Sequence, residues 1–350
     1  MVNTHASGVP SGDCLMVVHY ILKRTGLFIG HKNEAFSLKV FDRIQSVDRP
    51  PASVSVALGL FDGLHLGHMG VIARARQAAE DRRLALGVFT FTMNGAVPPH
   101  KQPGEIISFN MFSDIMRDMG VDYIFRPDFS QFHDIPAVDF INTVLLGRFG
   151  AAHISCGENF RFGRGGGGGT GTLIELCRGR AGVDIVPMLS VDGAPVSSSR
   201  IRARIQAGDI PAANALLGRR FCIDFEVVHG RALARSWGSP TINQPFPDTF
   251  VTPRFGVYAT VSRIANTWYS SVTNVGVKPT VGSDHVLAET YIHDFEGDLY
   301  GRKVRVDFLD FIRPERKFDD LETLRAQINA DSAAAADIAG AYVVKANGSQ

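Results

Sequence analysis

The sequence predicts two domains of different class, an α/β domain with a mainly parallel sheet followed by an antiparallel β domain. The chain has 350 residues, more than a single hydrophobic core usually serves. Up to about residue 210, strand-like segments alternate with helix-like ones, which is typical of a parallel sheet covered by helices. From residue 221, short alternating strands separated by turns indicate an antiparallel barrel or sandwich.

The elements of the first part follow from apolar spacing and turn residues. Short, β-branched apolar runs predict strands, and longer runs rich in Ala, Leu, Arg and Met predict helices. The expected strands are Ser53–Leu58, Leu84–Thr92, Tyr123–Arg126 and His153–Cys156. The expected helices are Met69–Asp81, Asn110–Met119, Pro136–Arg148, Ala203–Ala207 and a short one within Gly208–Gly218.

The second part is expected to hold five strands and one helix. The strands are Phe221–Val228, Gly256–Val261, Thr267–Val275, Ala288–Ile292 and Lys303–Ile312, and the helix is Leu321–Asp331. The expected division is an N-terminal extension (1–37), a first domain (38–210), a linker (211–221), a second domain (222–335) and a tail (336–350).

Composition excludes several classes of partner. The formal net charge is +1, and Lys and Arg are spread along the chain, so we expect no nucleic-acid or membrane surface. Cys14, Cys156, Cys177 and Cys222 form no C-x-x-C pair, which favours a reduced, cytoplasmic protein. The apolar run Leu15–Leu22 is too short to span a bilayer. The sequence does not specify an oligomeric state.

The chain is organised around the segment Val54–His68. A buried strand ends at Gly59, and a turn then carries His65, Gly67 and His68 into a helix. Helix N-terminal amides bind phosphate readily, and two imidazoles there are placed to stabilise charge on an α-phosphate. A metal site is the rival interpretation, but no third ligand is evident. Two surface histidines in a turn remain the simplest alternative.

Two further segments suggest contacts with a nucleotide. Asn159 follows the strand His153–Cys156, and five glycines, Gly165 to Gly169, come soon after. This pattern indicates a mobile loop beside a ligand, or alternatively a disordered tip without chemistry. Ser197–Arg202 precedes a helix, where its hydroxyls serve either as ordinary caps or, with the arginines, as a second anion cradle.

In the second part, the oxygen-bearing side chains of Thr241 and Asn243 suit Mg²⁺ and phosphates. Glu289 is a strand carboxylate that could accept a proton from a substrate hydroxyl. The alternative for Thr241 is an ordinary turn residue without a ligand, and the alternative for Glu289 is a solvent-facing strand carboxylate.

Taken together, these motifs resemble the bacterial bifunctional riboflavin kinase/FMN adenylyltransferases, also called FAD synthetases. The resemblance covers roughly residues 38–333, in the family's motif order. The motifs are Gly59–His68, Gly157–Gly163, Ser197–Arg202, Gly238–Asn243, Asn274–Thr280, Glu289 with Asp294–Gly301, and Arg313–Phe318. The resemblance implies a Rossmann-like nucleotidyltransferase domain followed by a riboflavin kinase β-barrel.

The resemblance implies two activities, with ATP as co-substrate and Mg²⁺ or another divalent cation as cofactor. Riboflavin would be phosphorylated to FMN in the barrel, and FMN would be adenylylated to FAD in the α/β domain. The implied catalytic residues are Glu289, His65 and His68. The implied ATP and phosphate contacts are Gly59, Phe61, Gly67, Asn159, Ser198, Ser199, Arg202, Gly238, Pro240 and Asn243. Thr241 and Asn243 would hold the metal, and Arg313 and Glu315 the flavin.

The sequence departs from the family in its loops. Thr92–Gly95 replaces a Pro-His-Pro segment, and glycines replace charged residues after Gly163. Ala232 and Ala234 stand where the kinase phosphate loop has glycine. A monofunctional adenylyltransferase with an impaired kinase domain is therefore one alternative. A catalytically inactive flavin-binding regulator is another, although it predicts loss of His65, His68 or Glu289, all of which are present.

Overall fold

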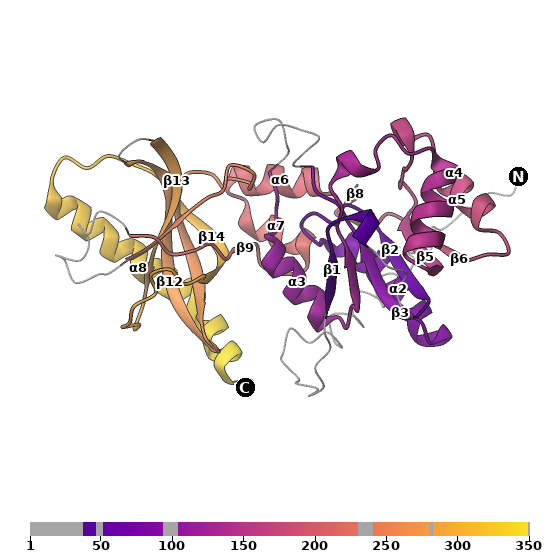
Figure 1. The fold of residues 1–350 in the computed structure, drawn as a ribbon. Helices are drawn as coiled ribbons and strands as arrows, with labels where there is room; N and C mark the ends of the chain where they lie inside the picture. The colour runs from indigo at the N-terminus through magenta and orange to yellow at the C-terminus, as the bar shows by residue number, and fades with distance from the viewer. Residues whose placement is uncertain (1–37, 47–51, 94–103, 230–240, 281–282, 349–350) are drawn as a thin grey trace, which may run out of the picture.

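The computed structural model describes residues 38–46, 52–93, 104–229, 241–280 and 283–348. It contains two six-stranded sheets side by side, with helices α6 and α7 between them (Figure 1). The N-terminal sheet carries helices on its faces, and the C-terminal sheet curls beside the long helix α8. The predicted change of class along the chain is therefore confirmed.

The N-terminal sheet is parallel throughout and has the order β1-β4-β3-β2-β5-β6. All five residues of its central strand β2 are buried. The chain passes outward from β2 in both directions, so the carboxyl ends of β2 and β5 flank a topological switch point, where α/β folds bind ligands. The strands are β1 (Lys39–Phe41), β2 (Val54–Leu58), β3 (Ala85–Phe89), β4 (Tyr123–Phe125), β5 (Ala151–Gly157) and β6 (Gly182–Val186).

The helices of this part differ from the predicted ones at their ends. α2 (Leu66–Arg82) begins three residues before the predicted Met69. The predicted helix Pro136–Arg148 consists of one α-helical turn, α4 (Ala137–Asp139), followed by a wider π-helix, η4 (Phe140–Arg148). α3 spans Phe109–Asp118. Short 3-10 turns are η1 (Ile44–Ser46), η3 (Phe129–Gln131) and η5 (Arg164–Gly166).

Two elements at this edge were not predicted. β6 is short and only partly buried, and α5 (Thr170–Cys177) follows the glycine run with no side-chain cap. α5 lacks a capping side chain at its start, whereas the β-branched residues Val183, Ile185 and Val186 of β6 are a strand signal that the sequence analysis did not use.

α6 (Ser198–Ala207) and α7 (Ile210–Leu217) join the two parts, after a small hairpin of β7 (Ser190–Val191) and β8 (Ala194–Pro195). Ile201 and Ile205 of α6 and Leu216 of α7 lie in one hydrophobic cluster with barrel residues such as Tyr258 and Phe308. Most of the predicted linker 211–221 is thus helix α7, buried against the barrel. The predicted boundaries stay predictions, because these helices pack against both parts.

The C-terminal sheet is antiparallel, with the order β10-β13-β12-β11-β14-β9. Val228 N donates to Asn243 O at 2.8 Å, so the segment after β9 returns to β10 and the sheet curls toward closure. The predicted strand Phe221–Val228 pairs only as β9, with single bridges at Glu226 and Val228. The strands are β9 (Cys222–Ile223), β10 (Thr241–Pro245), β11 (Gly256–Ile264), β12 (Thr267–Thr280), β13 (Ser283–Ile292) and β14 (Arg305–Pro314).

The C-terminal helix is longer than predicted. α8 covers Leu321–Gly348 and includes most of the residues predicted as a tail. Asp331, Ala335 and Ala339 are its buried residues, and the helix packs on β11, β12 and β14. Small side chains let a helix approach a sheet closely. The alanine-rich segment was predicted to be a tail because its sequence has few large apolar residues.

Candidate active sites

The turn between β2 and α2 is strained and buried. Phe61 and Leu64 have left-handed backbones, with φ of 54° and 42°, and both side chains are 1% exposed. Left-handed geometry costs a non-glycine residue about 1–2 kcal/mol. Strain held in place by surrounding packing is common at functional sites, so this turn is the first candidate site.

His65 is the N-cap of α2. Its Nδ1 accepts a hydrogen bond from the main-chain N–H of His68 at 3.3 Å, which satisfies one of the free amides of the helix start. A neutral imidazole that accepts at Nδ1 carries its proton on Nε2. His65 therefore presents an Nε2–H donor, and the cap explains why the helix begins at Leu66.

His68 lies in the first turn of α2 and stacks on His65, with ring centroids 3.5 Å apart. The Phe61 ring meets His68 edge-on at 5.4 Å. Burial lowers the pKa of His65 to about 4, and burial together with the nearby His65 holds the pKa of His68 well below 6.5. Both rings are therefore neutral near pH 7, which suits hydrogen-bond donation to phosphate rather than proton uptake.

The turn's glycines make room for these rings. A Cβ on Gly67 would lie 3.3 Å from His65 Nδ1, and one on Gly59 would lie 2.9 Å from the Phe61 ring. Gly59, Phe61 and Gly67 thus support the histidines. Any role of theirs as ATP contacts stays a prediction.

A second helix start reaches the same turn. Ser197 caps α6 by accepting from Arg200 N at 3.3 Å, and Ser198 Oγ donates to the main-chain oxygen of Asp62 at 2.9 Å. Arg202 Nε donates to Gly104 O at 2.7 Å. Two helix N-termini with free amide donors therefore converge, which is the arrangement that binds anions.

Asp62 is the residue that the sequence analysis missed. Its carboxylate forms an ion pair with Arg202 and accepts from Ile106 N at 2.8 Å. Burial raises the pKa of this carboxyl, and Ile106 and Arg202 oppose that rise. Asp62 lies in the quoted motif, but only the fold shows that it joins three chain segments.

The other predicted nucleotide contacts, Ser199 and Asn159, have no hydrogen bond to the histidine turn among the described residues. Ser199 is exposed in the first turn of α6, and Arg200 donates instead to the carbonyls of Val191 and Ala194, both at 2.9 Å. Asn159 is exposed just beyond the carboxyl end of β5.

The glycine run forms a closed turn. Phe162 N donates to Gly168 O at 3.1 Å, and Gly168 N donates to Phe162 O at 2.9 Å. Arg161 Nε also donates to Gly166 O at 2.9 Å. A disordered tip does not describe this segment.

A small cavity opens beside the histidine turn, with a volume of about 80 Å³. It lies at the carboxyl ends of β2, β3 and β4, and Arg126 stacks on Phe109 in its wall at 4.1 Å. Aromatic walls with a few cationic groups suit a flat, anionic ligand. Its lining is Leu60, Phe61, Asp62, Thr90, Phe91, Thr92, Met93, Glu105, Ile107, Phe109, Phe112, Arg126 and Arg202.

The second candidate site is a row of polar side chains across the barrel. Asn243 of β10 is opposite Glu289 of β13, and Glu289 is opposite Asn274 of β12. Directly opposed residues share one face of a sheet. Thr241 Oγ1 donates to Glu289 Oε1 at 3.2 Å. The structure thus brings together three predicted kinase residues, Thr241, Asn243 and Glu289.

The predicted flavin contacts lie further along this face. Arg313 is bound to Asp331 of α8 through Nε at 3.0 Å and Nη2 at 2.7 Å. Glu315 is exposed, and its Oε1 would lie 2.0 Å from a Cβ on Gly276. Gly238, Pro240, Ala232 and Ala234 lie outside the described residues.

The donor set of the barrel face fits Mg²⁺. Thr241 and Asn243, the predicted metal-holding residues, offer hydroxyl and amide oxygens, which hard cations prefer. Within the described ranges, no group of three or more His, Cys, Asp or Glu residues could hold a metal ion by itself.

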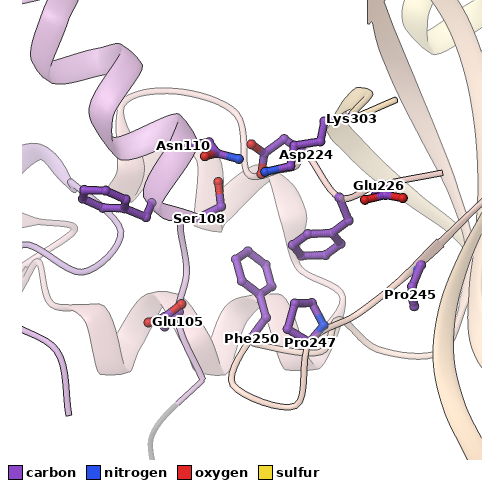
Figure 2. Close-up of a pocket in the computed structure, with 11 residues that line it drawn as sticks. Glu105, Ser108, Asn110, Asp224, Glu226, Pro245, Pro247, Phe250 and Lys303 are labelled. Atoms are coloured by element: carbon purple, nitrogen blue, oxygen red, sulfur yellow. The ribbon is translucent and has the colours of Figure 1, made fainter. Parts of the chain in front are cut away.

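A larger cavity of about 300 Å³ lies between the two parts. Figure 2 shows Asn110 and Ser108, from the start of α3, facing Asp224 of the barrel. Burial raises the pKa of Asp224, while hydrogen bonds from Ser108 and Asn110 oppose that rise. None of the predicted catalytic residues lines this cavity, so we interpret it as part of the domain contact.

No helix within the described parts of the chain is long and apolar enough to cross a membrane. Cys156, Cys177 and Cys222 are free and buried.

Comparisons with known proteins identify both domains. The family model described as FAD synthetase matches residues 48–200, and the one described as riboflavin kinase matches residues 217–339. A solved structure titled as a macrolide-efflux protein from Streptococcus pneumoniae has a TM-score of 0.75 and 30% identity. The match covers 84% of this chain and 97% of the solved chain.

Two curated relatives match most of the chain. The bifunctional riboflavin kinase/FMN adenylyltransferase of Bacillus subtilis is 32% identical over 286 residues, 79% of this chain and 89% of the relative. That of Escherichia coli K12 is 30% identical over 310 residues, 87% of this chain and 98% of the relative. The two family matches support both activities, and neither alternative gains support. The chain therefore belongs to the bifunctional riboflavin kinase/FMN adenylyltransferases, which use ATP to phosphorylate riboflavin to FMN and to adenylylate FMN to FAD.

Proposed function

We propose that the turn carrying His65 and His68 is the adenylyltransferase centre and that the row around Glu289 is the kinase centre. The observation that carries the first assignment is the convergence of α2 and α6 at Asp62, which aims two helix starts and two neutral imidazoles at one place. The second rests on the cross-strand row that unites Thr241, Asn243 and Glu289.

In the first centre, a phosphate oxygen of FMN attacks the α-phosphorus of ATP. The new O–P bond forms as the bond between the α-phosphorus and the bridging oxygen breaks, and pyrophosphate leaves with the electron pair. His65 donates through Nε2–H and His68 lies beside it, so both stabilise charge that builds on the α-phosphate. Ser198, Ser199, Arg202 and the α6 amides hold the leaving pyrophosphate, and Asn159 contacts the nucleotide. Positioning and charge compensation suffice for such a transfer.

The adjoining cavity is the proposed place for the FMN ring. Phe91, Phe109 and Phe112 supply aromatic surface, and Arg202 borders both the cavity and the histidine turn. FMN bound there would have its phosphate close to the anion site. Phe109→Ala should raise the KM for FMN, whereas Phe255→Ala, which changes an exposed phenylalanine of the barrel, should not.

In the second centre, Glu289 accepts the proton of the ribityl hydroxyl as its oxygen attacks the γ-phosphorus of ATP, and ADP leaves. Thr241 orients the carboxylate through its 3.2 Å hydrogen bond. Thr241 and Asn243 would hold Mg²⁺, which neutralises phosphate charge when bound. Arg313 fixes α8 beside this face through Asp331, and with Glu315 it marks the proposed flavin side. A cytoplasmic location remains a prediction.

A crosswise experiment tests both assignments. Glu289→Gln should slow FMN formation from riboflavin by about 100-fold, the scale of a lost general base, and leave FAD formation from FMN unchanged. His65→Asn keeps a capping side chain but loses the Nε2–H donor, and should slow only FAD formation, also by about 100-fold. Chromatographic time courses started from riboflavin and from FMN measure the two steps. Loss of both activities in either variant, or the opposite pattern, would refute the assignment.

A further inference from the structure

The linker contributes a buried cation next to the histidine turn. Arg219 follows Gly218, the C-cap of α7. Gly218 packs on the first residue of α2, since a Cβ there would lie 2.3 Å from Leu66 Cδ2. Besides burial, the positive charge of Arg219 lowers the pKa of His65 and His68, and it interacts with Cys222 and Asp307 of the barrel, so Arg219 lies between the start of α2 and the barrel.

Arg219 lacks hydrogen-bond partners for part of its guanidinium. Its Nε and Nη1 are buried, and neither has a partner among the described residues. A buried cation without hydrogen-bond partners is strongly destabilising. A ligand with anionic oxygens would supply the missing hydrogen-bond acceptors and the negative charge.

The two carboxylates near Arg219 are already paired with other arginines. Asp62 is paired with Arg202. Asp307 accepts from Arg305 through both oxygens, at 2.6 and 3.0 Å.

The other groups around Arg219 carry no compensating negative charge. Burial raises the pKa of the Cys222 thiol to about 11, so this neighbour is uncharged, as are His65 and His68 near pH 7. Among the described residues here, the positive charge of Arg219 is left without a counter-charge.

We infer that Arg219 is a further phosphate-binding residue of the adenylyltransferase centre, where it helps to hold the leaving pyrophosphate. This inference rests on the proposed role of the histidine turn. Arg219 adds the charge that the paired Arg202 cannot supply alone, and a guanidinium binds phosphate oxygens through two parallel N–H groups.

The test compares Arg219→Gln and Arg219→Lys with Arg220→Gln. Arg220 is the matched control because it is adjacent but stacks on Tyr342 of α8, 3.6 Å from the ring centroid. For each full-length variant, adenylylation of FMN gives the kcat, the KM for ATP and the inhibition constant of inorganic pyrophosphate. Riboflavin phosphorylation by the same preparation reports an intact fold.

We expect Arg219→Gln to raise the inhibition constant of pyrophosphate and lower kcat/KM about tenfold or more, the scale of lost charged hydrogen bonds. Arg219→Lys should restore part of the loss, and Arg220→Gln should behave as the wild type. An unchanged inhibition constant, or equal loss of both activities with a lowered melting temperature, would overturn the inference.

If Arg219→Gln does not fold, Arg219→Lys decides by the same inhibition constant. A raised value with normal riboflavin phosphorylation supports the inference, and an unchanged value overturns it. His65→Asn is assayed alongside. If that variant also adenylylates FMN at the wild-type rate, the proposed centre itself is wrong, whereas a defect in His65→Asn alone rejects only the role of Arg219.

Discussion

Among single side chains, His65 makes the clearest thermodynamic prediction, because it is only 5% exposed. Its pKa falls from 6.5 to about 4 on folding, so the unfolded chain binds more protons between these values. Its contribution to the free energy of unfolding is full above about pH 6.5 and declines as the pH falls toward 4. Between neutral pH and about pH 5, that decline amounts to about 2 kcal/mol.

Urea denaturation of the wild type and His65→Asn, at neutral pH and at about pH 5, measures how much His65 contributes to the acid loss of stability. The variant should lose less stability on acidification, because asparagine keeps the cap and does not titrate. His133→Asn is the control, since the His133 side chain is 43% exposed. An equal acid loss in all three proteins would contradict the prediction.

Asp62 makes a second prediction for a single side chain. Asp62→Asn preserves an acceptor for Ile106 N but removes the charge opposite Arg202. Breaking a buried pair from one side costs about 3–5 kcal/mol, and the freed arginine no longer points at the anion site. We expect a lower melting temperature, together with slower FAD formation and unchanged FMN formation. A variant that is destabilised but adenylylates FMN normally would leave Asp62 a purely structural role.

Between helices, the contact of α7 with α2 depends on a glycine. Gly218 has φ of +70°, and a Cβ there would overlap Leu66. Gly218→Ala should therefore destabilise the protein by more than the roughly 1 kcal/mol of left-handed strain, and should displace the start of α2. We expect reduced FAD formation as well.

Gly193→Ala separates strain from contact. Gly193 has nearly the same φ, +72°, but an added Cβ meets nothing within 4 Å. Thermal denaturation should show a smaller loss for Gly193→Ala than for Gly218→Ala, and normal adenylylation. Equal losses would mean that the overlap with Leu66 is relieved at no cost.

In the whole molecule, the loop before α3 connects the barrel to the anion site. Glu105 N donates to Thr249 O at 2.7 Å, and Val251 N donates to Glu105 O at 2.9 Å. A Cβ on Gly104 would lie 2.6 Å from Val251 N, and Gly104 O accepts from Arg202 at 2.7 Å. Arg202 is therefore positioned partly by the barrel.

Gly104→Ala should push the loop before α3 away from the barrel segment at Val251 and slow FAD formation about tenfold. FMN formation should continue. Gly171→Ala is the control, because a Cβ there meets nothing within 4 Å in α5. Assays of both steps, with limited proteolysis as a probe of the domain contact, check the outcome. Wild-type FAD formation by Gly104→Ala would show that the two parts work independently.

Local signals in the sequence were sufficient for the change of fold class and for the strand-turn-helix at Gly59–His68. The helix predicted as Ala203–Ala207 begins earlier, at Ser198, and Ser197 is its cap. Hydrophobic period, glycines and capping residues act over a few neighbouring positions, so they can be read without the fold. The same locality explains why the length of α8 was missed, since its alanine-rich second half depends on packing against distant strands rather than on its own pattern.

Only the tertiary structure decided which distant residues meet. The register of β10, β13 and β12 sets Asn243, Glu289 and Asn274 in one row, and the packing of α6 and α7 brings Arg202 and Arg219 to the histidine turn. Strand register and helix docking are fixed by long-range burial and hydrogen bonding, which no local pattern encodes. The sequence therefore specified the chemical groups, and the fold specified their partners and their charge balance.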